Sequence, residues 1–156
     1  MKYLSIPLVC FALLMVSSCN KSGGLTLATI NEPITAVSIT LPLATTNLNN
    51  DLILKLVNDK RTSGCNCGVD VMPPVALLTW NNALSVAASR HSEDMSSNNF
   101  LTHTSSNGAT LNDRINLTGY KWSAIGENIA SGTFTEQTVV DAWIASSAHC
   151  KNIMSA

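Results

Sequence analysis

The stretch Gly-Glu-Asn-Ile-Ala at residues 126–130 decides the fold of this chain. It belongs to a run, Ala124 to Ser131, in which apolar and polar residues alternate loosely before a Ser-Gly pair. Alternation that ends in a turn signal predicts a β-strand with one apolar face. Side chains two residues apart share a face, so Glu127 is expected beside Ile125 and Ile129.

Helical patterns precede this strand. Residues 51–61 carry apolar side chains at helical spacing, after Asn50 or Asp51 as a cap and before Gly64. Residues 62–79 contain two Gly and two Pro and predict a long loop. We expect this loop and the residue after it to carry four apolar side chains into the core: Val75, Leu77, Leu78 and Trp80.

A second helix is expected after Asn81 or Asn82. Its inward stripe comprises Leu84, Ala87, Ala88, His91 and Met95. Thr110 can cap a short third helix that ends by Gly119, and Thr135 a final one that ends before His149. The expected buried face of the final helix consists of Val139, Val140, Trp143 and Ile144.

One strand alone leaves its backbone donors and acceptors unpaired. Either residues 20–50 supply a partner strand, or the chain stops before its sheet is complete. The chain ends directly after the apolar Ile153-Met154 and Ser155-Ala156, which is typical of a truncated domain. We therefore expect residues 50–156 to form one incomplete domain.

The N-terminus has the features of an export signal. A basic start at Lys2 is followed by an apolar run and by small residues before Cys19, which predicts a leader at residues 1–18. Val16-Ser17-Ser18-Cys19 resembles the bacterial lipobox, so we expect cleavage before Cys19 and lipid attachment to its thiol. Residues 19–49 are then a lipidated Cys and a flexible tether, and the domain is held at the membrane of a bacterial cell envelope.

The charge of the chain excludes one class of partner. The formal net charge is -1, and Lys60-Arg61 is the densest basic cluster. Without a basic stripe, a nucleic-acid partner is not expected.

Three cysteines remain for the folded domain, Cys65, Cys67 and Cys150. Cys65 and Cys67 are too close in sequence to pair, because alternate extended residues point side by side. A bridge from Cys150 to one of the two is expected, and its long loop would stabilise the fold by roughly 4 kcal/mol in the chain-entropy model. A metal site at the Cys-x-Cys pair would need further ligands that the sequence does not show nearby.

Few titratable residues are available for chemistry. His91 points inward on its helix and has a structural interpretation, as do Asp94, Asp113 and Arg114. His103, on a loop, and Glu127, on a strand, are better placed to meet at a cleft, where a carboxylate fixes the tautomer of a ring and raises its basicity.

Three roles remain open for His103 and Glu127. They could act as a general base and its orienting partner. With His149 they could form a metal site with an open position, the arrangement of catalytic zinc. They could also form a polar clasp between loop and strand without turnover.

The residues that carry the chemistry also carry a resemblance. The chain is similar, from about Leu52 to Met154, to the CAP superfamily, the SCP-like extracellular domain, in its compact bacterial form. The matching residues are Asn58, residues 78–81, Ala87-Ala88, His91-Ser92-x-Asp94-Met95, Phe100-x-x-His103, Gly108, Asp113-Arg114, Gly119-Tyr120, residues 126–130, Trp143 and residues 146–154.

The resemblance implies an α+β fold, an α-β-α sandwich whose closing strands are missing here. In eukaryotic members the cleft holds two His and two Glu that can bind a divalent metal such as zinc. His103 and Glu127 match the first of each, the second Glu is replaced by Ser146, and the second His lies beyond Ala156. His149 could compensate. The resemblance also implies that a cysteine staples the first loop to the last helix.

Members of this superfamily have been linked to sterol or fatty-acid binding, to signalling and to proteolysis. We therefore expect a binding or interaction module for a lipid-like or peptide ligand at a cleft formed by His103, Glu127, His149 and Asn128. The alternative is a metal-assisted hydrolase that uses the first three of these residues. His91, Asp94, Arg114 and Trp143 are expected to serve the architecture.

Overall fold

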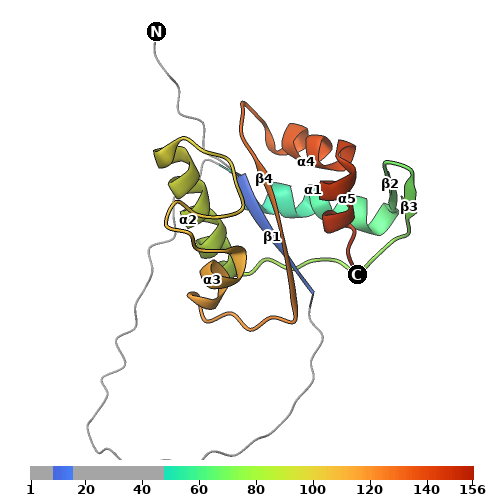
Figure 1. Cartoon of the computed structure of the whole chain (residues 1–156). Coiled ribbons are helices and arrows are strands. Elements are labelled where there is room, and N and C mark those ends of the chain that lie inside the picture. The colour runs from blue at the N-terminus through green and yellow to red at the C-terminus, as the bar shows by residue number, and fades with distance from the viewer. Residues whose placement is uncertain (1–8, 16–47) are drawn as a thin grey trace, which may run out of the picture.

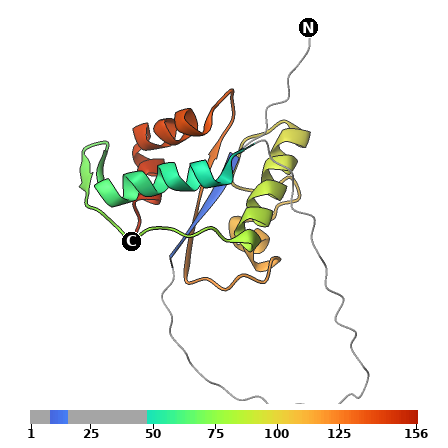
Figure 2. The same cartoon turned by 180° about the vertical axis from the view of Figure 1, so that it is seen from behind.

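The structure is a computed structural model that describes the backbone of residues 9–15 and all of residues 48–156. Two helices, α2 (Asn82–Asn98) and α3 (Leu111–Asn116), lie on one side of a two-stranded sheet (Figure 1). Three others lie on the opposite side: α1 (Asn50–Ser63), α4 (Glu136–Ala145) and α5 (Ser147–Ile153). The view from behind shows the same three layers (Figure 2). The predicted α+β class and its α-β-α sandwich are confirmed.

The central sheet pairs β4 (Ala124–Ala130) with β1 (Val9–Met15) in an antiparallel ladder. The register runs from Val9 opposite Ala130 to Met15 opposite Ala124. The strand expected at residues 124–131 is therefore present. Its partner belongs to the stretch that the sequence assigns to the leader. The tether expected at residues 19–49, or the partner strand expected within residues 20–50, falls largely in residues 16–47, which lie outside the described part of the chain.

Two residues, Asn49 and Gly64, determine where α1 begins and ends. Asn49 has an extended backbone, and its side-chain Oδ1 accepts a hydrogen bond from Leu52 N at 3.0 Å. The cap is thus Asn49, one residue before the expected position. Gly64 ends the helix with φ +69°, where a Cβ would press on the carbonyl of Met72.

The segment expected to be a plain loop contains a hairpin. Cys65–Cys67 (β2) pairs with Asp70–Met72 (β3) in a separate two-stranded sheet. The prediction that all four apolar residues after the hairpin enter the core was wrong for two of them. Val75 and Leu78 pack against the core, but Leu77 is 61% exposed and Trp80 is 37% exposed.

The final helix of the prediction is divided into two. Ser146 adopts an extended backbone, with φ -91° and ψ 118°, which ends α4. The chain then turns into α5, so His149 and Cys150 lie within a helix and not after one. Cys150 N donates to Ser146 O at 2.8 Å, which closes the first turn of α5.

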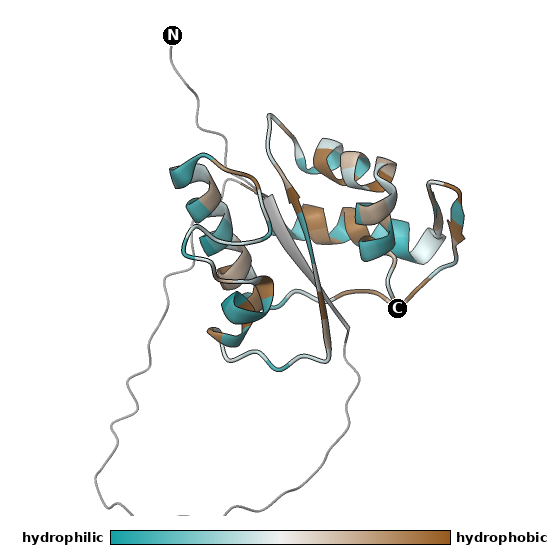
Figure 3. Cartoon of the chain, in the orientation of Figure 1, coloured by the Kyte–Doolittle hydropathy of each residue, from teal (hydrophilic) through white to brown (hydrophobic). Residues whose placement is uncertain are grey.

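Separate apolar clusters fill the two spaces beside the sheet. On the side of α1, α4 and α5 the buried residues include Val57, Val139, Trp143 and Ile153. On the side of α2 and α3, Leu84, Ala87 and Ile115 form a second cluster, against which Ile125 packs. Figure 3 shows the consequence for β4, whose apolar ends flank a hydrophilic middle at Glu127 and Asn128. No helix within the described residues is both long and apolar enough to cross a bilayer.

Candidate functional site

His103 and Glu127 meet, although they come from different elements. His103 Nδ1 lies 2.9 Å from Glu127 Oε1. The Glu127 side chain is only 2% exposed, whereas the His103 side chain is 57% exposed. A carboxylate only accepts hydrogen bonds, so Nδ1 of the ring carries the proton that it donates to Glu127. β4 thus positions the buried carboxylate of Glu127, and this carboxylate fixes the orientation of the exposed His103 ring.

Arg114, on α3, balances the buried charge of Glu127. Its Nη2 donates to both carboxylate oxygens of Glu127, at 2.9 and 2.7 Å. Its Nη1 donates to His103 O at 2.9 Å, and to Ser105 Oγ and Ala109 O at 3.3 Å. The guanidinium therefore joins the loop at 103–109 to β4. Arg114 Nε is buried and has no hydrogen-bond partner among the described residues.

His91 lies behind this cluster on the inward stripe of α2 and is 1% exposed. Its Nε2 donates to Thr102 O at 2.8 Å, and its Nδ1 accepts from Ser105 Oγ at 3.2 Å. A ring with one donor and one acceptor nitrogen is neutral. Burial, and then the nearby charge of Arg114, lower the pKa of His91, in agreement with this arrangement.

Asp94 fixes the other end of the loop. It accepts hydrogen bonds from Ser106 N at 2.8 Å and Ser106 Oγ at 2.5 Å, and from Asn98 Nδ2 at 2.9 Å. The bonds from Ser106 are the main reason why the pKa of Asp94 is lowered. A carboxylate that accepts several hydrogen bonds is stabilised in its charged form. Asp94 thereby keeps the loop closed over α2.

Asn128 and His149 lie differently from the expected cleft. Asn128 follows Glu127 in β4 and so projects to the opposite face, where its Nδ2 donates to His149 O at 3.1 Å. Its Oδ1 accepts from Asn152 Nδ2 at 2.8 Å. Burial and, to a smaller extent, the charge of His103 lower the pKa of His149. Trp143 is buried on α4, and its Nε1 donates to Ile129 O at 3.4 Å.

A divalent-metal site, one of the three roles left open for His103 and Glu127, is not favoured by this arrangement. Within the described residues, the group of His, Cys, Asp or Glu side chains with metal-ligand spacing is that of Cys65, Cys67 and Cys150. His103, Glu127 and His149 are not such a group. Both oxygens of Glu127 are already engaged by Arg114, and one also by His103. These residues hold a charge-compensated cluster and do not fit a zinc centre of the expected kind.

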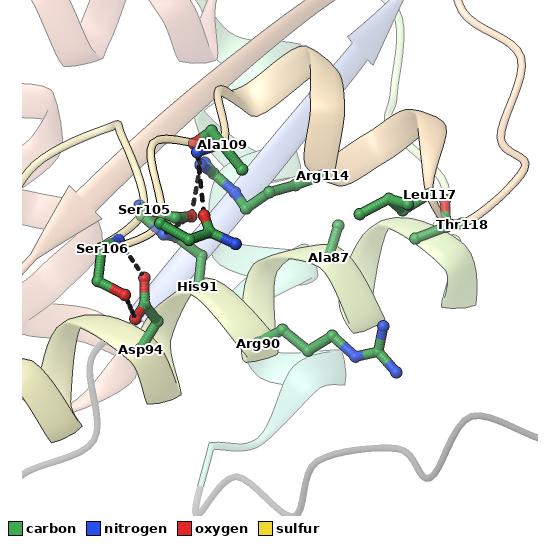
Figure 4. A pocket seen from close by; sticks show the side chains of 11 residues that line it. Ala87, Arg90, His91, Asp94, Ser105, Ser106, Ala109, Arg114, Leu117 and Thr118 are labelled. Carbon is green, nitrogen blue, oxygen red and sulfur yellow. Dashed lines mark hydrogen bonds between the residues drawn. The ribbon is translucent and has the colours of Figure 1, made fainter.

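A cavity of about 190 Å³ is lined in part by Arg114. Its wall includes His91 and Asp94 from α2 and Ser105 and Ser106 from the loop, and Figure 4 shows Arg90 extending along α2 away from Asp94. The sequence predicted the inward position of His91. It gave no signal for Arg90, Ser105 or Ser106, because the loop that brings the two serines to α2 has no periodic pattern.

The chain thus combines an α-β-α sandwich with a His and Glu cluster between a loop and the central strand. The chain belongs to the cysteine-rich secretory protein family, CAP, which its residues 54–156 match. Membership of this family indicates an extracellular interaction module.

Two proteins of Bacillus subtilis strain 168 are similar to the chain. The uncharacterized protein YkwD is 36% identical over 78 residues, which cover 50% of this chain and 30% of YkwD. The uncharacterized membrane protein YlbC is 32% identical over 81 residues, which cover 52% of this chain and 23% of YlbC. The chain therefore spans less than a third of either relative. No solved structure matches it.

Proposed function

We propose that this chain is an envelope-anchored interaction module that binds a peptide or lipid-like ligand through His103. The observation that carries the proposal is the pairing of an exposed ring with a buried carboxylate. Glu127 fixes the orientation of the His103 ring, and Arg114 fixes Glu127. A polar group that is oriented before the ligand arrives loses little conformational freedom on binding.

The tautomer of His103 specifies what the ligand must offer. Nδ1 donates to Glu127, so Nε2 is the remaining ring nitrogen, and it accepts a hydrogen bond when the ring carries a single proton. It has no hydrogen bond to another of the described residues. A ligand with an N–H or O–H donor satisfies it, such as a peptide backbone amide or the hydroxyl of an acylglycerol. Leu101, which is 47% exposed, and the half-buried Phe100 add apolar surface on the same loop.

The contacts of Glu127 favour binding over the alternative of a metal-assisted hydrolase. In a metal site Glu127 would have to direct a carboxylate oxygen at the cation. Here the guanidinium of Arg114 bonds to both oxygens, so Glu127 supports the ring and is not directed at a substrate.

The location of the module is part of the proposal. The leader at residues 1–18 and the lipobox that ends in Cys19 support export and attachment to the bacterial cell envelope. Lipidated Cys19 is the proposed membrane contact, and residues 19–49 are the proposed tether. Both rest on the sequence, since Cys19 lies outside the described residues.

Binding to the full chain can be measured by calorimetry with a panel of synthetic hexapeptides and with monopalmitoylglycerol. His103→Ala should weaken binding of the best probe about tenfold, which is the usual contribution of one well-made hydrogen bond to affinity. Thr104→Ala, the neighbouring exposed residue, is the matched control and should bind as the wild type does. If the best probe is a peptide, its N-methylated copy, which lacks the donors, should lose the same affinity.

Equal affinity for wild type and His103→Ala would contradict the proposal. Zinc-dependent cleavage of the peptides that is lost in His103→Ala would support the hydrolase instead.

A further inference from the structure

Three cysteines converge where the hairpin packs against α5. Cys67 and Cys150 form a disulfide with a Cα–Cα distance of 5.3 Å. Cys65 is free, and its Sγ lies 3.6 Å from Sγ of Cys150. All three sulfur atoms lie within 4.8 Å of one another. Cys150 therefore has two neighbours in β2 and is bonded to one of them.

The strand geometry explains the convergence. Cys65 and Cys67 are two residues apart in β2, so their side chains leave the same face, while the intervening Asn66 is exposed. That face is turned toward α5. Neither cysteine has to cross the strand to reach Cys150.

Contacts other than the disulfide hold the hairpin against α5. Ser147 Oγ donates to Cys67 O at 3.1 Å, and Lys151 Nζ lies 2.5 Å from Asp70 Oδ2. A Cβ on Gly68 would touch Ser147, which shows how closely the hairpin approaches the helix. These contacts keep all three sulfur atoms together when the bond between two of them is broken.

We propose that Cys65, Cys67 and Cys150 form a thiol–disulfide exchange site, in which Cys150 pairs alternately with Cys67 and Cys65. The thiolate of Cys65 attacks Sγ of Cys150, so the Cys65–Cys150 bond forms as the Cys67–Cys150 bond breaks. Cys67 leaves as a thiolate and takes up the proton that Cys65 lost. One disulfide and one thiol are present before and after the step, and no oxidant or reductant is needed.

Exchange lets the hairpin keep a disulfide to α5 when one cysteine of β2 is blocked. If a reagent blocks either cysteine of β2, the other remains within reach of Cys150. The half-buried Cys65 is the sulfur that such a reagent meets first, because Cys67 and Cys150 are 0% exposed. The free thiol of Cys65 and the Cys67–Cys150 disulfide thus belong to one exchange site.

The exchange rate should depend on pH. Burial raises the pKa of Cys65, and the charge of Lys60 opposes this effect. The thiol form therefore predominates at neutral pH, while the thiolate is the attacking species. Below the pKa the rate should rise about tenfold per pH unit.

The first test uses the full chain with Cys67→Ala. After air oxidation, acid quenching and alkylation in denaturant, peptide mapping should find Cys65 and Cys150 joined and unalkylated. The matched variant Cys65→Ala should contain only the Cys67–Cys150 bridge. Alkylation of both Cys65 and Cys150 in Cys67→Ala, under conditions where Cys65→Ala is fully bridged, would overturn the proposal.

A second measurement does not depend on the folding of a variant. Wild-type chain held at pH 9 and then quenched in acid should yield two bridged forms, distinguished by fragment ions that locate the alkyl group on Cys65 or on Cys67. Both forms are expected, and they should equilibrate more slowly at pH 6. Alkylation confined to Cys65 at every pH and time would show that no exchange occurs.

Discussion

At the scale of single residues, Arg114 links more of the polar cluster than any histidine does. It is 7% exposed and bonds at once to the carboxylate of Glu127 and to the loop that carries His103. A desolvated ion pair contributes little net stability when intact, but removing one partner leaves an uncompensated buried charge. We therefore expect replacement of Arg114 to affect folding stability more than it affects ligand binding.

Arg114→Lys tests this role. Lysine keeps the charge but lacks the planar fork that reaches Glu127, His103 O and Ala109 O together, so the free energy of unfolding should fall by about 2–3 kcal/mol. Arg90→Lys, an exposed position on α2, is the matched control and should change it by less than about 0.5 kcal/mol. Urea denaturation measures both, and equal stability of the two variants would contradict the assignment.

Residue patterns predicted some of these positions and not others. The helical stripe of α2 placed His91 inside correctly, because one period determines which face is buried. The contact of Arg114 with Glu127 joins a helix to a strand, and no local pattern encodes it. The expected cleft grouped Asn128 with Glu127 by motif, although neighbouring strand residues face opposite ways.

At the scale of elements, β4 passes very close to α5 at Gly126. A Cβ on Gly126 would collide with the side chain of Asn152, which is bonded to Asn128 Oδ1. Glycine is required here for space, since the strand passes directly beneath the helix. Gly126, part of the motif at residues 126–130, thus allows β4 to pack against α5.

Gly126→Ala should lower the free energy of unfolding by about 1–3 kcal/mol, because the new methyl group forces Asn152 out of place. The double variant with Asn152→Ala removes the obstacle, so Gly126→Ala should cost less in that background. Thermal and urea unfolding of the four chains complete the cycle. An equal cost in both backgrounds would show that the collision is not the cause.

Helix caps were predictable, and short strands were not. Asn81, Thr110 and Thr135 cap their helices as expected, since a polar side chain before an apolar period is a local signal. The hairpin of β2 and β3 has three-residue strands and no apolar alternation, and the nearby Gly and Pro residues favoured a loop. The division between α4 and α5 depends on the extended backbone of Ser146, which leaves no mark in the sequence pattern.

At the scale of the whole molecule, the buried His91 and the half-buried His149 make stability depend on pH. The pKa values of His91 and His149 are lowered in the folded state, so the unfolded chain binds protons more tightly at these sites. Their contribution is fully present above the unfolded value near 6.5 and is lost as the pH falls through the lowered values.

The free energy of unfolding should therefore decrease between pH 7.5 and pH 5, by at most about 1.4 kcal/mol per pH unit for each histidine. His91→Gln keeps a donor for Thr102 O and removes the titrating ring, so its stability should vary less over this range. Urea denaturation at each pH gives the comparison. A variant with the full wild-type slope would show that His91 does not contribute.

The ladder between β1 and β4 has a consequence for the export that we propose. Residues 9–15 form the seven-residue strand that pairs with β4, and the same residues form the core of the expected leader. Under the proposed export, these residues would not be available to β4 while an export machinery holds them, and the proposed cleavage before Cys19 would separate them from β4. Under that proposal, translocation and closure of the sheet compete in time, and the faster of the two determines whether β4 pairs with β1 before the chain crosses the membrane.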